Sequence, residues 1–339
     1  MPPAKRCGME KNMKLGTIGT GIIVKIFLDG ALKNDFELQA VYSRNQETGE
    51  ALLKEFNGKK VYSSLEEMLK DEEVEIVYVA SPNSLHFEQT LKALQHNKHV
   101  ITEKPFTSTT KELQILMKEA KKRHLFLFEA ITNIHLPNYK LIKEHIGKIG
   151  RIKIIQCNYS QYSRRYDALL KGETPNVFNP EFSGGALMDI NIYNIHFVLG
   201  LFGEPKEVVY FANKHANGID TSGILILKYD DFLCELVGAK DTKSVNFAMI
   251  QGEKGYIYLD GASGCKEVKV VTNDTEEVYN LQESLNPLYY ECVDFMEIIK
   301  NGAFNECYDL LEHSKQVMEV VEKARKSATI VFKVDEAIE

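Results

Sequence analysis

The chain has 339 residues, of which 44% are hydrophobic, and a formal net charge of −7. This length suggests about two domains, and the apolar share is enough for a full core. The acidic balance gives no support for a nucleic-acid-binding face, and no segment has the ~18 uninterrupted apolar residues of a membrane span. We therefore expect neither nucleic acid nor a membrane as a partner.

The cysteines and the N-terminus indicate the compartment. No two cysteines form a C-x-x-C motif and none has metal-ligand spacing with a histidine pair, so we expect no metal site. We predict reduced thiols in a cytoplasmic protein. Residues 1–12 lack the apolar core of a signal peptide and are expected to be a disordered extension or a tag, with Met13 as a candidate native start. The six cysteines are Cys7, Cys157, Cys234, Cys265, Cys292 and Cys307.

Residues 13–130 alternate short apolar runs with helical stretches. Three of the runs are nearly continuous in apolar residues, as strands covered on both faces would be. The stretches between them carry apolar residues at helical spacing. This alternation predicts right-handed βαβ units and a parallel sheet, that is, an α/β domain.

The first run leads into a glycine turn, "KLGTIGTGIIVKIF". Gly19 would make the tight turn, and Gly21 would let a pyrophosphate approach the N-terminus of a helix that begins with Ile22 and Ile23. Val24 stands where a third small residue is usual, so the motif is G-x-G-x-x-V. An ordinary glycine turn is the alternative, but the strand before it and the helix after it favour a dinucleotide site.

The second run ends "AVYSRN", without the acidic residue that usually binds the ribose 2′-hydroxyl of NAD. Ser43 and Arg44 stand there, and a hydroxyl and a guanidinium suit a 2′-phosphate. The sequence therefore predicts NADP as the cofactor. NAD stays open, because Arg44 would stack on adenine in either dinucleotide.

Polar residues follow two other runs of the expected parallel sheet. Ligands bind beyond the carboxyl ends of parallel strands, and "KHVITEKPF" brings Glu103 and Lys104 to that edge. "YVASPNSLHFEQ" brings Ser81, Asn83 and His86 to the same edge. Lys104 would lie near the nicotinamide. The structural alternatives are a Glu103–Lys104 ion pair, a helix cap at Asn83 and a satisfied helix residue at His86.

Residues 131–330 differ in character from the first part. Short β-type runs with short turns predict antiparallel hairpins, and helices are expected near 285–300 and 306–326. The prediction is a substrate-binding α+β domain with a large, mostly antiparallel open sheet and helices on one face. The other face needs a cover, and a second subunit is the simplest one, so we expect a homodimer or homotetramer. The C-terminal helix could also pack back on the first domain.

A long apolar helix is expected over 184–203. Asp189, Tyr193 and His196 fall at i, i+4 and i+7, which is one face of this helix. Buried polar groups must be hydrogen-bonded or must face a cavity. The stripe either holds a substrate in a cavity between the domains or forms a satisfied core network, and the pattern alone does not separate the two.

Taken in order, "GTIGTGII", "AVYSR", "ASPNSLH", "EKP", "GGALMDINIY" and "GEKGYIYL" resemble the Gfo/Idh/MocA oxidoreductase family. The resemblance covers nearly the whole chain from Met13. It implies a Rossmann dinucleotide-binding domain, an α/β substrate domain and oligomerisation from sheet to sheet. Tyr193 occupies the position of the histidine proton shuttle found in many members, which is similar to the branch of glucose–fructose oxidoreductase and dimeric dihydrodiol dehydrogenase.

The same resemblance implies roles for the site residues. Lys104 matches the family's catalytic lysine, Tyr193 would move the proton, and Asp189 would orient the substrate or Tyr193. A close ammonium should lower the pKa of the phenol. The implied reaction is NAD(P)-dependent hydride transfer with a secondary alcohol or carbonyl of a sugar-like, polyol or dihydrodiol substrate. An NAD-dependent glycosidase of the same family and a non-catalytic dinucleotide-binding regulator are the alternatives, and the presence of Lys104 argues against the regulator.

Overall fold

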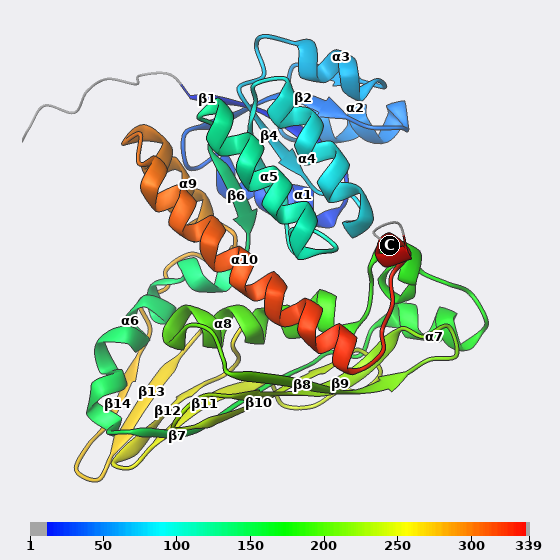
Figure 1. The fold of residues 1–339 in the computed structure, drawn as a ribbon. Helices are drawn as coiled ribbons and strands as arrows, with labels where there is room; N and C mark the ends of the chain where they lie inside the picture. Colours follow the sequence, from blue (N-terminus) through cyan, green and yellow to red (C-terminus); the bar gives the residue numbers. More distant parts are fainter. Residues whose placement is uncertain (1–11, 337–339) are drawn as a thin grey trace, which may run out of the picture.

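The computed structural model describes residues 12–336, and Figure 1 shows two sheets, one above the other, with helices between and around them. The expected N-terminal extension lies outside the described residues except for residue 12. Most of the chain's helices lie around the upper sheet or between the sheets, and the lower sheet is covered on one side (Figure 1).

The first sheet has six strands in the order β3-β2-β1-β4-β5-β6. All neighbouring pairs are parallel, so the α/β prediction is confirmed. The chain moves outward in one direction from β1 and then in the other from β4, and this reversal opens a crevice at the carboxyl ends of these two strands. The strands are β1 (Met13–Ile18), β2 (Phe36–Tyr42), β3 (Lys60–Tyr62), β4 (Ile76–Val79), β5 (His99–Glu103) and β6 (Leu127–Ala130).

Amphipathic helices connect these strands. On α5 the buried residues Leu113, Leu116, Met117 and Ala120 repeat at helical spacing and form one face against the sheet. The start of α5 is fixed by a capping box of Thr109 with the residue three positions on. The helices are α1 (Ile22–Ala31), α2 (Gln46–Glu55), α3 (Leu65–Lys70), α4 (His86–Gln95) and α5 (Thr110–Arg123), with a 3-10 turn η1 (Asn83–Leu85) before α4.

The second sheet has eight strands in the order β14-β13-β12-β11-β7-β10-β9-β8. Its pairs are antiparallel except β7 with β10, which are parallel, so the mostly antiparallel prediction is confirmed. The parallel pair brings the carboxyl ends of β7 and β10 side by side. The strands are β7 (Ile152–Ser160), β8 (Glu207–Lys214), β9 (Asp220–Lys228), β10 (Leu233–Ala239), β11 (Phe247–Gly252), β12 (Gly255–Leu259), β13 (Val268–Thr272) and β14 (Glu276–Tyr279).

Helices cover one face of this second sheet. In Figure 1, α6, α8 and α10 lie on the side of the first domain, and no helix formed by residues 12–336 lies on the opposite side. The helices are α6 (Pro137–His145), α7 (Arg164–Leu170), α8 (Ile192–Phe202), α9 (Tyr289–Lys300), α10 (Phe304–Ser327) and α11 (Lys333–Glu336). A π-helical turn, η6 (Leu187–Asn191), leads into α8, and the 3-10 turns are η2 (Thr132–His135), η3 (Ile146–Ile149), η4 (Asn176–Phe178) and η5 (Pro180–Phe182).

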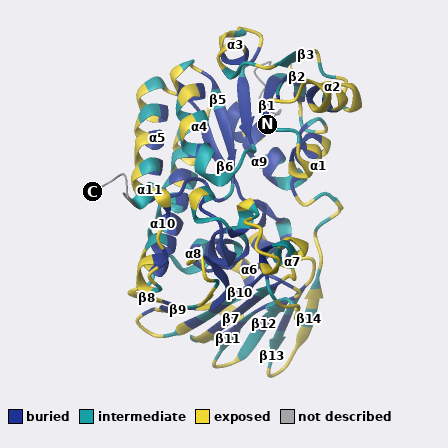
Figure 2. Ribbon diagram, turned by 90° about the vertical axis from the view of Figure 1, so that its right-hand side faces the viewer, coloured by how far each residue is buried: buried dark blue, intermediate teal, exposed yellow. Residues whose placement is uncertain are grey.

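The segment containing α8 is very apolar. Pro180–Phe202 has the length and hydropathy of a membrane span, but 72% of its most apolar window is buried inside the protein. Figure 2 shows α8 dark blue between the two sheets. Two buried asparagines bind it to the second sheet, because Asn191 donates to the Leu236 carbonyl and Asn194 to the Val237 carbonyl. The helix is therefore a core element that β10 holds in register.

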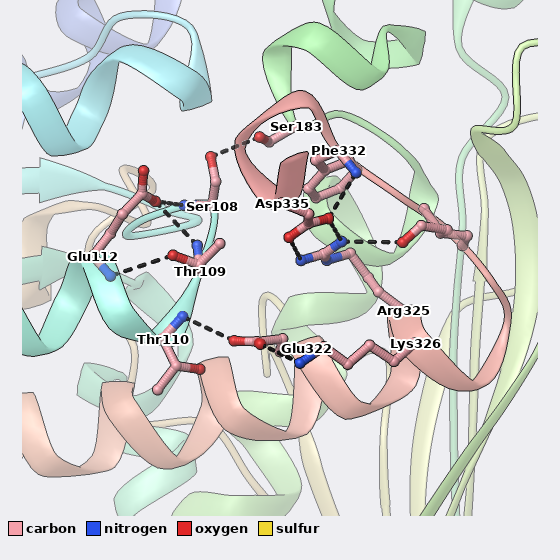
Figure 3. A network of polar contacts seen from close by, with 11 residues as sticks. Ser108, Thr109, Thr110, Glu112, Ser183, Glu322, Arg325, Lys326, Phe332 and Asp335 are labelled. Carbon is pink, nitrogen blue, oxygen red and sulfur yellow. Dashed lines mark hydrogen bonds and ion pairs between the residues drawn. The ribbon is translucent and has the colours of Figure 1, made fainter. Parts of the chain in front are cut away.

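Polar contacts join the two domains at the loop before α5, as Figure 3 shows. The Ser183 hydroxyl donates to the Ser108 hydroxyl at 2.6 Å, and the Thr110 N–H donates to Glu322 of α10 at 3.1 Å. Helix α10 also packs on β6 and α5, and α9 packs on α1. Helices α9 and α10 thus return to the first domain.

Candidate active site

A cleft lies between the carboxyl edge of the first sheet and the second domain, with a volume of about 760 Å³. It combines the glycine turn, the ends of β4 and β5, and the start of the buried helix. Most of the residues that the sequence predicted therefore meet in one place. The predicted residues that line it are Gly21, Ile22, Ile23, Ser81, Asn83, His86, Glu103, Lys104, Asp189 and Tyr193.

The two glycines of the turn have different reasons to be glycine. Gly19 has φ of +113°, and a Cβ there would lie 2.7 Å from the Ala80 carbonyl oxygen, so the turn needs glycine. Gly21 has an ordinary φ of −72°, and a Cβ there would meet nothing within 4 Å. Its missing side chain keeps space open at the first N–H groups of α1, and Ile22 beside it is 79% exposed.

The end of β2 only partly fits the predicted 2′-phosphate site. The buried Ser43 hydroxyl donates to the Asn45 carbonyl oxygen at 2.8 Å and lies 3.0 Å from the Thr48 hydroxyl. The hydroxyl therefore stabilises the turn into α2. Arg44 is exposed, which leaves its guanidinium as the group able to meet a phosphate.

Asn83 and His86 hold the region beyond β4. The Asn83 amide donates to the carbonyl oxygen of Ser183 in the second domain at 3.0 Å, and no side chain caps η1 or α4, so the capping alternative is wrong. Both ring nitrogens of the buried His86 lie 2.9 Å from carbonyl oxygens, those of Ser81 and Pro105. Burial lowers the pKa of His86, although the two carbonyl oxygens act in the opposite direction. The two contacts make His86 a supporting residue.

Lys104 reaches from the first domain to the second. Its ammonium donates to the backbone carbonyl of Asp189 at 2.7 Å and to Oδ1 of the same residue at 3.1 Å. The Lys104–Pro105 peptide bond is cis. Burial opposes the charged form, but Asp189, Tyr193 and Glu103 outweigh it and raise the pKa of Lys104 above its ordinary value. Lys104 is therefore a positively charged donor at neutral pH.

Glu103 is the last residue of β5, directly before Lys104. It is buried and accepts a hydrogen bond from the Tyr78 hydroxyl. Burial raises the pKa of Glu103 to about 7. The alternative of a Glu103–Lys104 ion pair is wrong, because the partner of Lys104 is Asp189.

Tyr193 lies beside this lysine. The Lys104 Nζ is 5.1 Å from the centroid of the Tyr193 ring, and the Tyr159 ring meets that ring edge-on at 5.9 Å. Burial raises the pKa of Tyr193 and Lys104 acts in the opposite direction, but burial is the stronger effect. The expected lowering of this pKa is therefore wrong for the net shift, and the phenol keeps its proton at neutral pH.

His196 does not belong to the cleft. Its Nδ1 lies 3.0 Å from Nε2 of His313, and its Nε2 lies 3.5 Å from a carboxylate oxygen of Glu129. A step of three residues turns a helix by about 300°, which leaves His196 about 60° away from Tyr193. The helix face prediction thus holds for Asp189 and Tyr193 in the cleft, and His196 is part of a core network.

The sequence did not reveal Lys240, which follows β10 and lines the same cleft. Its ammonium pairs with Oδ2 of Asp189. No local motif marks this lysine, because its place depends on the pairing of β10 with β7. Arg165 of α7 also lines the cleft. A neighbouring cavity of about 560 Å³ is also lined by Tyr193 and so borders the cleft.

Tyr210 and Lys214 have the Y-x-x-x-K spacing of short-chain dehydrogenases, but both lie on β8. Tyr210 donates to the buried Asp220, and Lys214 is exposed. Within residues 12–336, no group of three or more His, Cys, Asp or Glu side chains could hold a metal ion.

Comparison with known proteins identifies the family. A family model described as "Oxidoreductase family, NAD-binding Rossmann fold" matches residues 13–130, and one described as "GFO/IDH/MocA C-terminal domain" matches residues 140–258. The chain is 37% identical over 327 residues to scyllo-inositol 2-dehydrogenase (NADP(+)) IolU of Bacillus subtilis (strain 168), covering 96% of this chain and 100% of that protein.

More distant relatives agree. Trans-1,2-dihydrobenzene-1,2-diol dehydrogenase of Mus musculus is 25% identical over 343 residues, which cover 95% of this chain and 99% of that protein. The solved structure of KijD10, a 3-ketoreductase from Actinomadura kijaniata in complex with NADP and TDP-benzene, shares the fold, with a TM-score of 0.83, 20% identity, and coverage of 94% of this chain and 98% of that one. The chain belongs to the GFO/IDH/MocA family of oxidoreductases, whose first domain has an NAD-binding Rossmann fold.

Proposed function

We propose that this chain is an NADP-dependent dehydrogenase or reductase that acts on a secondary alcohol or carbonyl of a sugar-like, polyol or dihydrodiol substrate. The observation that carries the proposal is the meeting of Lys104 and Tyr193, from different domains, in the cleft that begins at Gly21. The names of the relatives, an NADP-dependent inositol dehydrogenase and a dihydrodiol dehydrogenase, support this substrate class.

The cleft fits a dinucleotide. The open space at Gly21 and the free N–H groups at the start of α1 suit the pyrophosphate. Arg44 is placed to bind the 2′-phosphate that distinguishes NADP from NAD. When bound, the nicotinamide would accept or supply the hydride. Ile22 and Ile23 would cover one side of the cofactor, and Ser81 and Asn83 would border it.

The chain's own residues would handle the proton and the charge. In the reductive direction, Tyr193 gives its proton to the substrate oxygen while the carbonyl carbon receives a hydride. The ammonium of Lys104 stabilises negative charge that develops on that oxygen. Asp189 holds Lys104 in place through two hydrogen bonds. In the oxidative direction, the proton returns to Tyr193 by the same route.

The open face of the second sheet supports an oligomer. Phe211, Ile224 and Val237 are cross-strand neighbours on the face that no helix covers, and Phe211 is 64% exposed. Leu233 and Ile154 form another exposed pair on that face. We infer a homodimer or homotetramer that buries this face. Five buried cysteines without a disulfide among the described residues fit a cytoplasmic location.

The test is an assay of nicotinamide absorbance against a panel of sugars, polyols, dihydrodiols and dicarbonyls, with NADP and NAD in parallel. We expect turnover with at least one secondary alcohol or carbonyl, and a preference for NADP. Absence of a cofactor-dependent absorbance change across the whole panel would contradict the proposal. Release of an aglycone from a glycoside without net change in the cofactor would instead support the glycosidase alternative.

A further inference from the structure

Lys240 occupies a rigid position in the cleft. Its backbone N–H donates to the Thr221 carbonyl oxygen at 2.8 Å, and its own carbonyl oxygen accepts from the Ser163 N–H at 2.9 Å. Strand β9 and the segment after β7 therefore fix its backbone from two sides. The residue is only 5% exposed although it carries a charge, and a buried lysine needs a partner.

That partner is the carboxylate that also binds Lys104. Oδ1 of Asp189 accepts from Lys104 at 3.1 Å, and Oδ2 accepts from Lys240. Burial disfavours the ionised carboxylate, but the two ammonium groups more than reverse this and hold the pKa of Asp189 well below its ordinary value. One negative charge is thus shared between two positive charges in a largely buried site.

The sharing decides the charge beside Tyr193. Lys104 favours the ionised phenol and Asp189 disfavours it, so the carboxylate offsets part of the effect of the ammonium on Tyr193. With Lys240 added, the three side chains carry a net charge of about +1, because two ammonium groups face one carboxylate. Positive charge remains where the proton of Tyr193 would be transferred.

We propose that Lys240 is a positioning residue that binds Oδ2 of Asp189, so that the ammonium of Lys104 acts on Tyr193 and on the substrate oxygen. Lys240 acts through Asp189 and does not itself bind the reacting atoms. The sharing of the Asp189 carboxylate by Lys104 and Lys240 is argued from the geometry alone, whereas the effect on catalysis rests on the proposed function.

Charge sharing is tested without any substrate, by thermal unfolding of Lys104→Met, Lys240→Met and the double variant. Each single variant leaves Asp189 with one ammonium, but the double variant leaves a partly buried carboxylate with none. We expect the double variant to lose at least about 4 °C in Tm beyond the sum of the single losses. Independent packing roles would give additive losses, which would overturn the sharing.

A matched control is Lys243→Met, three residues further on, because Lys243 is exposed. Its effect on Tm should simply add to that of Lys104→Met. If Lys243→Met gave the same non-additivity as Lys240→Met, the effect would not come from Asp189 and the proposal would fail.

The effect on catalysis is tested with two variants of the same lysine. Lys240→Met keeps most of the side-chain volume and removes the charge, and we expect kcat to fall about 10- to 100-fold, with KM and the NADP dissociation constant changed less than about threefold. Lys240→Arg keeps the charge and should restore most of kcat. Unchanged kcat in Lys240→Met, or a large rise in KM alone, would overturn the positioning role.

The outcomes separate this proposal from the proposed function. A wild-type protein that turns over no substrate would refute the proposed function and the catalytic role of Lys240 together. The unfolding experiment would still decide whether Lys104 and Lys240 share Asp189.

Discussion

The ammonium of Lys104 lies 5.1 Å from the centre of the Tyr193 ring, although the two residues come from different domains. Lys104 follows strand β5 of the first sheet, and Tyr193 lies on the buried helix α8 that β10 holds in place. The two groups that would move charge and proton are thus positioned by different elements, Lys104 by β5 and Tyr193 by α8. A change that shifts either element should affect catalysis before it affects folding.

Loss of either group should remove turnover and spare cofactor binding. We expect Tyr193→Phe and Lys104→Met to lower kcat by about 10²- to 10⁴-fold, the usual range for a lost proton-transfer group. Steady-state kinetics measures this effect. The NADP dissociation constant, followed by the fluorescence of the reduced cofactor, should stay within about threefold of the wild-type value, because neither change removes a phosphate contact. Near-normal turnover in both variants would refute the assignment.

Removal of the exposed guanidinium at the end of β2 should reduce the preference for NADP. We expect Arg44→Ala to weaken NADP binding about 10-fold or more, since a hydrogen bond to a charged group contributes roughly 1.5–3 kcal/mol. NAD binding should change little, because NAD lacks the 2′-phosphate. Titration calorimetry with both dinucleotides measures the two effects, and unchanged NADP affinity would remove Arg44 from the site.

Glu103 should make the protein less stable as the pH rises. Burial raises its pKa from the ordinary 4.5 to about 7, so the folded state binds more protons than the unfolded state between these two values. Across that window the stability of the wild type should fall, relative to Glu103→Gln, by roughly 3 kcal/mol at most. Denaturant unfolding of both proteins from below pH 4.5 to above pH 7 measures the difference. Parallel stability curves would contradict the raised pKa.

The buried Arg325 should stabilise the C-terminal end of the fold. Figure 3 shows its guanidinium bound to Asp335 and to a backbone carbonyl, and it lies 4.0 Å from the centroid of the Phe332 ring. We expect Arg325→Met to lower the free energy of unfolding by about 3 kcal/mol, because it removes the only ion-pair partner that the structure gives Asp335 among residues 12–336 and leaves the Ile330 carbonyl without its donor.

Lys326 provides the matched control. It pairs with Glu322, but its side chain is 70% exposed, so Lys326→Met should change the free energy of unfolding by less than about 1 kcal/mol. Denaturant titration compares the two variants. Equal losses of unfolding free energy in both variants would show that the burial of Arg325 does not determine its contribution to stability.

The uncovered face of the second sheet should carry the subunit contact. Phe211→Glu places a charge at the most exposed aromatic position of that face, opposite Ile224 of the next strand. We expect it to convert an oligomer to a monomer with an unchanged far-ultraviolet circular dichroism spectrum. Light scattering after gel filtration measures the mass. A wild-type monomer, or an oligomer that survives the substitution, would place the contact elsewhere or exclude it.

Local patterns were enough to predict the framework of the site. The rule that ligands bind at the carboxyl ends of parallel strands placed Lys104 in the cleft, and helical spacing placed Asp189 and Tyr193 together. The fold class and the family are confirmed. The division of the chain near residue 130 and the roles of the site residues stay predictions.

What the sequence could not give depends on contacts between distant segments. Lys240 reaches Asp189 because β10 packs against the turn η6 that carries Asp189, and no short motif encodes that contact. The net pKa of Tyr193 depends on how completely the fold buries it, which spacing does not reveal. Ser43 has a side chain suited to a phosphate, but its own turn already uses the hydroxyl.

Ser183 has a consequence for how the enzyme would open. Asn83 and Ser108, both in the first domain, bond to this one residue of the second domain, just before the turn that carries Asp189. Both hydrogen bonds run from one domain to the other. A movement that separated the domains at this point would have to break them or carry Ser183 along with the first domain.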